Sequence, residues 1–367
     1  MKKRVYFKSS DETGSVKIKY FKINHLIVSD VQFTRLFKVN KKKRMLANVI
    51  ALLSMASASA YAANGSWTNT AGGSWATGTN WSTTPTPPGA TGTTDNLDTA
   101  TFGSAITGNR VITVDNRNIK SILFTGNPTH NYTLSSGSLL LTNGGTIVND
   151  SNTLNIISSG ITLQGNAGVA SFTSNVDSEL QINAVTGAST GADTVLTLNG
   201  SSKLDNYVSG VIGDGSGGGK LAVTKDGAGL WYFNSANTYS GLTEVKGGTL
   251  KLASAGRLGN GTGAVIVSGG ASLQLEAVSD ISNQLTLNGN GVSGQGALRN
   301  QSGVNNYTGN IILGSAARIN TFSGSTLNIS GSTINGPGQG LTIGGDGSTN
   351  ISSFITTGAG TLTKDGA

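Results

Sequence analysis

The sequence repeats itself, and internal repetition limits the folds that a chain can adopt. The pentapeptide Thr-Lys-Asp-Gly-Ala occurs at residues 224–228 and again at 363–367. A second pattern, Asn-x-Tyr-[Ser/Thr]-Gly, occurs at 237–241 and at 305–309. Repetition of this kind is typical of stacked architectures, in which each unit contacts mainly its neighbours. The chain is therefore expected to be a solenoid.

Short alternating runs of apolar residues favour strands. Residues 111–114, 161–163 and 195–198 are examples, and Gly, Asn, Ser or Asp separates such runs. With 54 Gly in 367 residues and abundant Asn, Ser and Thr, long helices are disfavoured. The absence of helical segments between the runs argues against βαβ units and leaves a sandwich, a propeller or a parallel β-helix. Unevenly spaced Asp-Gly turns favour an all-β parallel β-helix (β-solenoid) over residues 111–367.

The net charge of +7 belongs to the beginning of the chain. Residues 1–44 hold 13 of the 25 Lys and Arg but only 3 of the 18 Asp and Glu, so the remainder carries 12 basic and 15 acidic side chains. A nucleic-acid partner is excluded by this distribution, because it would require a basic patch in the mature domain. The chain has 0 Cys, so no disulfide stabilises it.

Residues 41–62 have the order of a cleavable signal peptide. Basic residues 41–44 precede an apolar run at 45–56 and small residues at 57–62. Ala60 and Ala62 occupy the −3 and −1 positions of the preferred cleavage site before Ala63, and cleavage after Ala60 or Ala58 is the alternative. The apolar run is shorter than the ~20 residues of a membrane-spanning helix. Residues 1–40 are interpreted either as an extended leader or as the product of a start assigned too far upstream.

Residues 63–110 contain three of the four Trp and are predicted to form an N-terminal β cap. Trp67, Trp75 and Trp81 lie among Gly, Ser, Thr and Asn. The end of a solenoid exposes an apolar cross-section that must be covered. A carbohydrate-stacking platform is the alternative, and burial of the three rings is the preferred interpretation.

Residues 220–275 carry the most specific pattern of the chain. They resemble the autotransporter-associated β-strand repeat, also called the passenger-associated transport repeat. A second copy begins at residue 361. The positions that match the repeat are Lys225, Gly227, Gly229, Asn237, Tyr239, Gly241, Thr243, Val245, Gly247, Gly248, Thr249 and Leu250.

The resemblance implies a right-handed β-helix passenger of type V secretion. Such a passenger is exported to the cell surface or outer membrane or is secreted, and its repeats support folding outside the cell. It implies a structural or adhesive role without catalysis, with a host or surface polysaccharide or protein as ligand. An outer-membrane β-barrel translocator is the expected partner. No barrel is visible in this sequence, which suggests a truncated passenger.

Gly227, Gly229, Gly247 and Gly248 are expected at corners where glycine permits a positive φ. Gly241 and Gly247 are expected at corners where a Cβ would clash. Tyr239 is expected to pack at the end of a rung with its hydroxyl on a turn backbone. Gly247→Val should therefore destabilise the chain more than Ser240→Ala.

Catalytic, cofactor and metal sites are not predicted. Outside the leader, which holds His25, the chain has one His, His130, and no Cys. Asp177 and Glu179 lie two residues apart and are expected on one face of a strand. Paired carboxylates on a β-helix define the alternative function, a secreted polysaccharide-degrading hydrolase or lyase.

Overall fold

The structure is a computed structural model that describes residues 63–366, apart from 93–95, 127–128, 165–168, 176, 189–190 and 279. Before residue 63 it describes only the backbone of five short strands. These pair antiparallel, as β1–β2–β5 and β3–β4, and are β1 Lys8–Ser9, β2 Val16–Ile18, β3 Phe21–Ile23, β4 Leu26–Val28 and β5 Val31–Phe33. The predicted signal peptide, including Ala60 and Ala62, lies outside the described residues.

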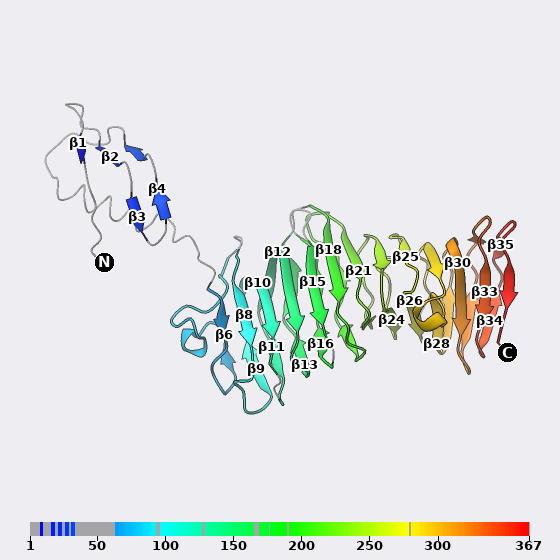
Figure 1. Cartoon of the computed structure of the whole chain (residues 1–367), viewed down its shortest axis with the longest axis horizontal. Coiled ribbons are helices and arrows are strands. Elements are labelled where there is room, and N and C mark those ends of the chain that lie inside the picture. The colour runs from blue at the N-terminus through cyan, green and yellow to red at the C-terminus, as the bar shows by residue number, and fades with distance from the viewer. Residues whose placement is uncertain are drawn as a thin grey trace. The chain divides into compact units, whose positions relative to one another are not determined.

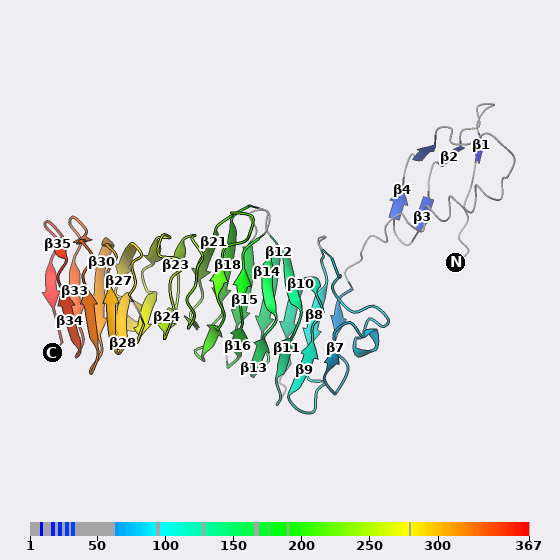
Figure 2. The ribbon, with the colours of Figure 1, turned by 180° about the vertical axis from the view of Figure 1, so that it is seen from behind.

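From Gly65 onward the chain forms a parallel β-solenoid of about 11 turns, with strands stacked side by side from β6 to β36 (Figures 1 and 2). All pairings between its named strands are parallel. The all-β fold with parallel strands is therefore confirmed, and the sense of winding remains a prediction. The only helical elements described are two short 3-10 turns, η1 Gly78–Asn80 and η2 Val292–Gly294.

Two long ladders of strands run along the solenoid. The first consists of β6 Gly65–Ser66, β8 Thr99–Phe102, β10 Arg117–Phe124, β12 Ser138–Asn149, β15 Val169–Ser174, β18 Thr194–Asn199, β21 Leu221–Lys225, β23 Thr243–Val245, β25 Val265–Val267, β27 Leu285–Gly289, β30 Ile311–Thr321, β32 Thr333–Asn335 and β35 Phe354–Thr356.

The second ladder consists of β7 Gly73–Ser74, β9 Arg110–Thr113, β11 Tyr132–Ser135, β13 Leu154–Ile157, β16 Glu179–Ile182, β19 Asn206–Val208, β22 Leu230–Phe233, β24 Thr249–Ala253, β26 Ser272–Glu276, β28 Leu298–Ser302, the end of β30, β33 Leu341–Gly344 and β36 Leu362–Lys364. Shorter strands complete the turns: β14 Gly160–Leu163, β17 Val185–Thr186, β20 Ile212–Gly213, β29 Val304–Tyr307, β31 Thr326–Ile329 and β34 Ser348–Ile351.

The core is a set of columns of like side chains. In the second ladder Ile182, Val208, Phe233, Leu252 and Leu275 occupy matching positions of successive strands, and all are buried. Alternation along each strand places every second side chain in such a column. Burial of one such side chain contributes about 1.5–3 kcal/mol, so the columns supply the stability that disulfides do not.

The N-terminal end of the core is closed by an aromatic cluster. Trp67, Trp75 and Trp81 are buried and pack around Phe102, with ring centroids 5.0–6.2 Å apart. The indole N–H groups of Trp75 and Trp81 donate to the carbonyls of Pro88 and Trp75 at 2.8 Å. These rings therefore do not form a solvent-facing platform for sugars.

Candidate functional site

The repeated pentapeptide forms a lysine clamp at the end of β21. The side chain of Lys225 is buried, and its Nζ donates to the carbonyls of Asp226 at 2.6 Å, Gly227 at 3.0 Å and Gly247 at 3.0 Å. The first two carbonyls lie in the turn that follows the lysine, and the third lies in the corresponding turn of the next rung. The clamp therefore joins two successive rungs.

The Asp-Gly pair shapes the turn that the lysine binds. The Asp226 carboxylate accepts the Gly227 N–H at 2.7 Å, and Gly227 has a φ of 69°. An L side chain rarely adopts that conformation, whereas glycine adopts it freely. The turn directs its carbonyl groups back toward Nζ of Lys225, which explains why Lys, Asp and Gly recur together.

The second pentapeptide repeats this geometry at the end of β36. Lys364 Nζ donates to the carbonyls of Asp365 at 3.1 Å and Gly366 at 3.3 Å, and Gly366 has a φ of 77°. Here Lys364 is exposed, whereas Lys225 is buried by the following rung. The two copies therefore differ in burial and share the local turn.

Burial lowers the pKa of Lys225 to about 8, and the neighbouring Asp226 carboxylate opposes that shift. Three carbonyl acceptors require three N–H donors, and only the ammonium form has them. Near neutral pH the clamp is therefore held by a buried cation that is fully hydrogen-bonded but bears a desolvation cost.

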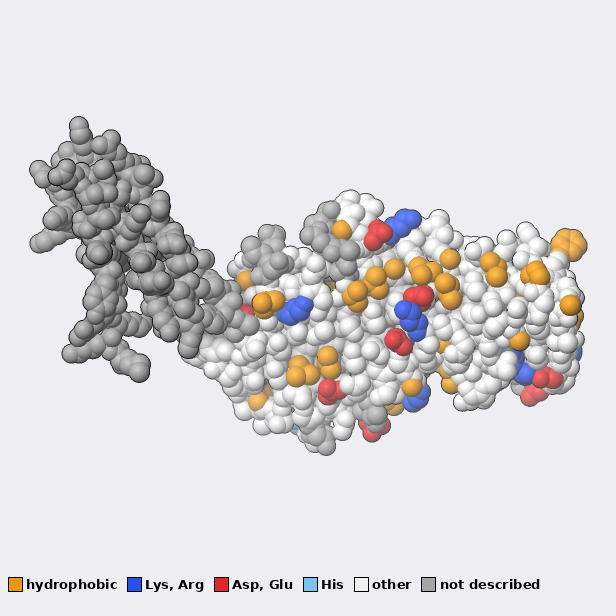
Figure 3. All heavy atoms as spheres, turned by 45° about the horizontal axis from the view of Figure 1, so that its top comes forward, with side chains coloured by type: hydrophobic (Ala, Val, Ile, Leu, Met, Phe, Trp, Pro, Cys, Tyr) orange, Lys and Arg blue, Asp and Glu red, His pale blue; other side chains and the backbone are white. Residues whose placement is uncertain are grey.

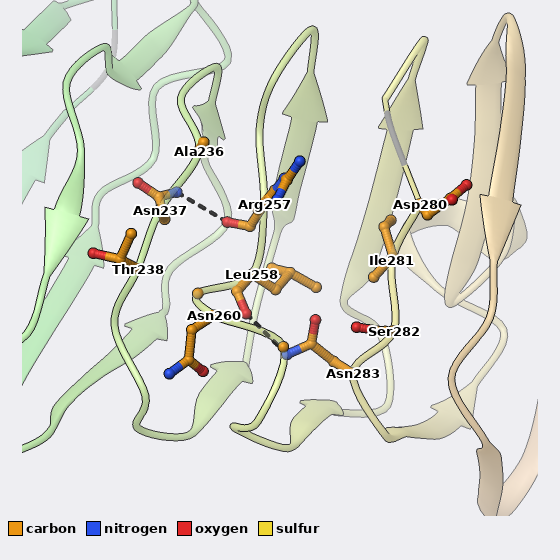
Figure 4. Close-up of a pocket in the computed structure, with 12 residues that line it drawn as sticks. Ala236, Asn237, Thr238, Arg257, Leu258, Asn260, Asp280, Ile281, Ser282 and Asn283 are labelled. Atoms are coloured by element: carbon orange, nitrogen blue, oxygen red, sulfur yellow. Dashed lines mark hydrogen bonds between the residues drawn. The ribbon is translucent and has the colours of Figure 1, made fainter.

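Asn237 is a bracket between rungs. Its Oδ1 accepts the N–H of Ile212 in the preceding rung at 2.8 Å, and its Nδ2 donates to the carbonyl of Arg257 in the following rung at 2.9 Å. Asn283 Nδ2 donates to the Leu258 carbonyl of the preceding rung at 2.8 Å, and Figure 4 shows this bond together with the bond from Asn237 to Arg257. Both asparagines line a hollow of about 330 Å³.

The two Asn-x-Tyr copies share one architecture. Asn305 Oδ1 accepts the N–H of Val278 in the preceding rung at 2.7 Å, as Asn237 does for Ile212. Tyr239 and Tyr307 are both buried, and burial raises the pKa of each phenol well above its usual value. The Tyr307 hydroxyl donates to a backbone carbonyl at 2.9 Å, whereas that of Tyr239 bonds to the Thr243 hydroxyl at 2.8 Å. The prediction that the Tyr239 hydroxyl contacts a turn backbone is therefore wrong.

The glycine expectations hold in part. Gly227 and Gly248 have φ values of 69° and 60°, whereas Gly229 and Gly247 lack positive φ. A Cβ on Gly248 would lie 2.3 Å from the Gly229 carbonyl oxygen, but one on Gly247 would lie 3.0 Å from its nearest neighbour. The reason given above for a severe effect of Gly247→Val therefore applies to Gly248 instead.

The remaining matched positions are structural. Val245 and Leu250 are buried in the core columns, and Thr243 and Thr249 are buried polar residues at the starts of β23 and β24. Gly241 lies against the preceding rung, where a Cβ would be 2.4 Å from the Leu221 carbonyl oxygen. The motif therefore encodes the packing of successive rungs.

A polar strip on the outer face of the second ladder was not predicted from the sequence. Tyr207, Tyr232, Lys251 and Gln274 occupy matching positions of β19, β22, β24 and β26. The tyrosine ring centroids lie 4.8 Å apart, and Lys251 Nζ lies 4.4 Å from the Tyr232 ring centroid. Tyr232 therefore contacts side chains of both the preceding and the following rung.

Carboxylates flank this strip. Lys251 Nζ lies 3.5 Å from a Glu276 oxygen and 3.7 Å from an Asp205 oxygen. Burial, with these carboxylates and Glu179 nearby, raises the pKa of Tyr232 to about 12, so its hydroxyl remains a donor at neutral pH. Figure 3 shows charged side chains singly and in small groups at several places on the drawn face of the solenoid.

The candidates for catalysis are not assembled into a site. Asp177 precedes β16 with a φ of 57°, so it does not share a strand face with Glu179, and the expected pairing is wrong. Within residues 63–366 as described, no group of three His, Cys, Asp or Glu side chains is arranged to hold a metal ion. Likewise, no helix in the described part of the chain has the length and hydropathy needed to span a membrane.

Comparison with known proteins finds a repeat family whose match includes the clamp. The passenger-associated-transport-repeat family matches residues 223–252, which include the clamp, the Asn237 bracket and Tyr239. The adhesin BmaC autotransporter of Brucella suis biovar 1 (strain 1330) is 35% identical over 75 residues, which are 20% of this chain and 2% of that protein. No solved structure gave a significant match. The chain therefore carries a passenger-associated transport repeat, and its similarity to an autotransporter adhesin supports a protein of the passenger type.

Proposed function

We propose that this chain is an exported, non-catalytic passenger that forms a stalk at the cell surface and takes part in adhesion. The observation that carries the proposal is the repeat at 223–252, whose clamp and bracket link its own rungs to the neighbouring ones. Hydrogen bonds between successive rungs favour folding that proceeds along the solenoid, one rung upon another. A chain that emerges unfolded at the cell surface can fold in such steps, and each folded rung prevents the chain from sliding back through the membrane.

The export role is tested by fusing the full chain to the translocator barrel of an autotransporter in a Gram-negative host. We expect the fusion to be protease-accessible at the surface and to lack its leader. Replacement of Lys225, Asn237 and Tyr239 together by Ala should lower the surface-exposed fraction more than the total amount of fusion. Ser240→Ala is the control in the same segment. Surface display that is equal in both variants would contradict the role of the repeat.

We assign ligand contact to Tyr207, Tyr232 and Lys251 of the polar strip on the second ladder. Its tyrosine hydroxyls and the flanking carboxylates suit a polar ligand such as a polysaccharide, because both can form hydrogen bonds with sugar hydroxyls. The name of the Brucella protein supports an adhesive role. Asp205, at 56% exposure, can be replaced without disturbing the core.

Beads coated with the chain should be captured on immobilised bacterial and host polysaccharides. The double variant Asp205→Lys with Glu276→Lys should reduce capture several-fold, because it reverses the charge beside Lys251. Asp150→Lys, placed on an earlier rung, is the control. Release of shorter saccharides during the incubation would instead support the polysaccharide-degrading alternative.

A further inference from the structure

Asp98 is a buried carboxylate without a cationic partner. It is 5% exposed, and it lies immediately before β8 at the N-terminal end of the solenoid. Its Oδ1 accepts the N–H of Ala63 at 2.6 Å, and its Oδ2 accepts the N–H of Gly89 at 2.7 Å. No Lys, Arg or His in the described part of the chain forms an ion pair with it. Burial of a carboxylate costs several kcal/mol unless a cation compensates it.

The residue that donates to Asp98 stands at the predicted processing site. Beyond Ala63 the chain is tied to β8 at successive positions: Asn64 Oδ1 accepts the Thr99 N–H at 2.9 Å, and Trp67 N–H donates to the Thr101 carbonyl at 2.8 Å. Gly65 pairs with Ala100 in the parallel ladder. These contacts position the Ala63 nitrogen beside Asp98.

We infer that Asp98 is the receptor for a new N-terminal ammonium, created when the peptide bond between Ala62 and Ala63 is cut. A peptidase of the export machinery breaks that C–N bond with one water molecule. The hydroxyl goes to the Ala62 carbonyl carbon, whose acid then loses its proton, and the Ala63 nitrogen gains two protons to become an ammonium. The nitrogen that donated as an amide now carries a positive charge 2.6 Å from Asp98 Oδ1.

This inference rests on the proposed export, and it separates the candidate cleavage sites. Cleavage after Ala58 or Ala60 leaves Ala63 as an uncharged amide, so only cleavage after Ala62 neutralises the buried carboxylate. Processing then stabilises the first turn of the solenoid, and with it the tryptophan cluster that closes the core. The uncleaved chain lacks this ion pair, so the end of the solenoid becomes fully stable only after the leader has left.

The test uses the full chain exported with its own leader. Mass spectrometry should find a product that begins at Ala63. A second chain carries Gly-Ser inserted between Ala62 and Ala63. Cleavage after Ala62 then leaves the hydrogen bond from the Ala63 amide intact, and the terminal ammonium lies on the inserted glycine, two residues away from Ala63. In urea, the insertion should raise the unfolding equilibrium constant about 10-fold, as expected for loss of a charge-assisted bond.

Double-mutant comparison isolates the ion pair. In an Asp98→Asn background, the same insertion should change the unfolding equilibrium constant by less than about 2-fold. In an Asp214→Asn background, it should still raise that constant about 10-fold. Asp214 is a suitable control, because it also accepts backbone N–H groups, from Leu221 at 2.7 Å and Ser240 at 3.1 Å. If Asp98→Asn does not fold, the processed protein without substitutions provides a second test of the ion pair. Its α-amine should react with an acylating reagent more slowly in the folded than in the urea-unfolded protein, because the ion pair protects it.

The outcomes separate the two proposals. A product cut elsewhere, an insertion effect equal in the unsubstituted and Asp98→Asn chains, or an α-amine equally reactive in folded and unfolded protein would overturn the inference and leave export standing. Retention of Met1 on a chain that never leaves the cytoplasm would overturn export, and the inference with it.

Discussion

Replacement of Gly241 by alanine is expected to destabilise the solenoid by about 3 kcal/mol. The added Cβ would lie 2.4 Å from the Leu221 carbonyl oxygen, 2.7 Å from its carbonyl carbon and 2.8 Å from Ala222 Cα. All three atoms are backbone of the adjacent rung, so no side-chain rotation relieves the overlap. Either β21 or the turn before β23 must move, and the ladder bonds between them weaken.

Gly269→Ala is the matched control, because a Cβ there meets nothing within 4 Å and φ is not positive. Hydrogen exchange measured by mass spectrometry should show faster exchange in residues 221–225 and 243–245 of the Gly241→Ala chain, and little change in rungs farther away. Equal protection of these segments in the two variants would show that the rungs can separate at low cost. Gly309→Ala should behave like Gly241→Ala, since its Cβ would lie 2.0 Å from the Asn283 carbonyl oxygen.

The sequence predicts the fold because the relevant information is local. Alternation within four to six residues specifies a strand, and glycine or Asp-Gly specifies its end. Residues 111–113 of the first example accordingly lie in β9, and residues 195–198 lie in β18. Burial of Trp67, Trp75 and Trp81 follows in the same way from their size and apolar surface.

Contacts between rungs were harder to predict, because the length of a rung varies. Tyr207 pairs with Tyr232 and Tyr232 with Lys251, which are offsets of 25 and then 19 residues. No fixed period aligns these three positions, so the outer strip was missed, and alignment of the buried columns is the signal that could have found it. For the same reason the sequence did not show that Gly241 and Gly248 pack against the preceding rung more closely than Gly247 does.

Replacement of Lys225 by methionine is expected to destabilise the chain by about 2 kcal/mol at pH 7. Two effects oppose each other. Methionine removes the cost of burying a cation, which is the cost that lowers the pKa of Lys225 to about 8. It also removes three charge-assisted hydrogen bonds, each worth about 1.5–3 kcal/mol, and leaves three carbonyls without their donor. The lost bonds outweigh the relieved burial, and urea unfolding measures the difference.

The titration of Lys225 gives this prediction a distinct signature. The unfolded chain keeps its lysine proton up to about pH 10.5, whereas the folded chain loses it from about pH 8. Between these values the unfolded state binds more protons, so stability rises with pH, by about 1.4 kcal/mol per unit once the folded group is deprotonated. Below pH 8 both states are protonated, and this contribution is flat. Measurements from pH 7 to about 9.5 avoid the range in which the unfolded tyrosines ionise.

Lys364→Met provides the control that separates the clamp from a general loss of charge. Lys364 donates to two carbonyls of its own Asp-Gly turn, at residues 365–366, but it is exposed. Its replacement should therefore change the free energy of unfolding by less than about 0.5 kcal/mol. The Lys364→Met chain should retain the rise of stability above pH 8. The Lys225→Met chain should lose that rise. A Lys225→Met chain as stable as the unsubstituted protein at pH 7 would mean that relief of burial cancels the three bonds, and that the lysine of the repeat does not hold successive rungs together.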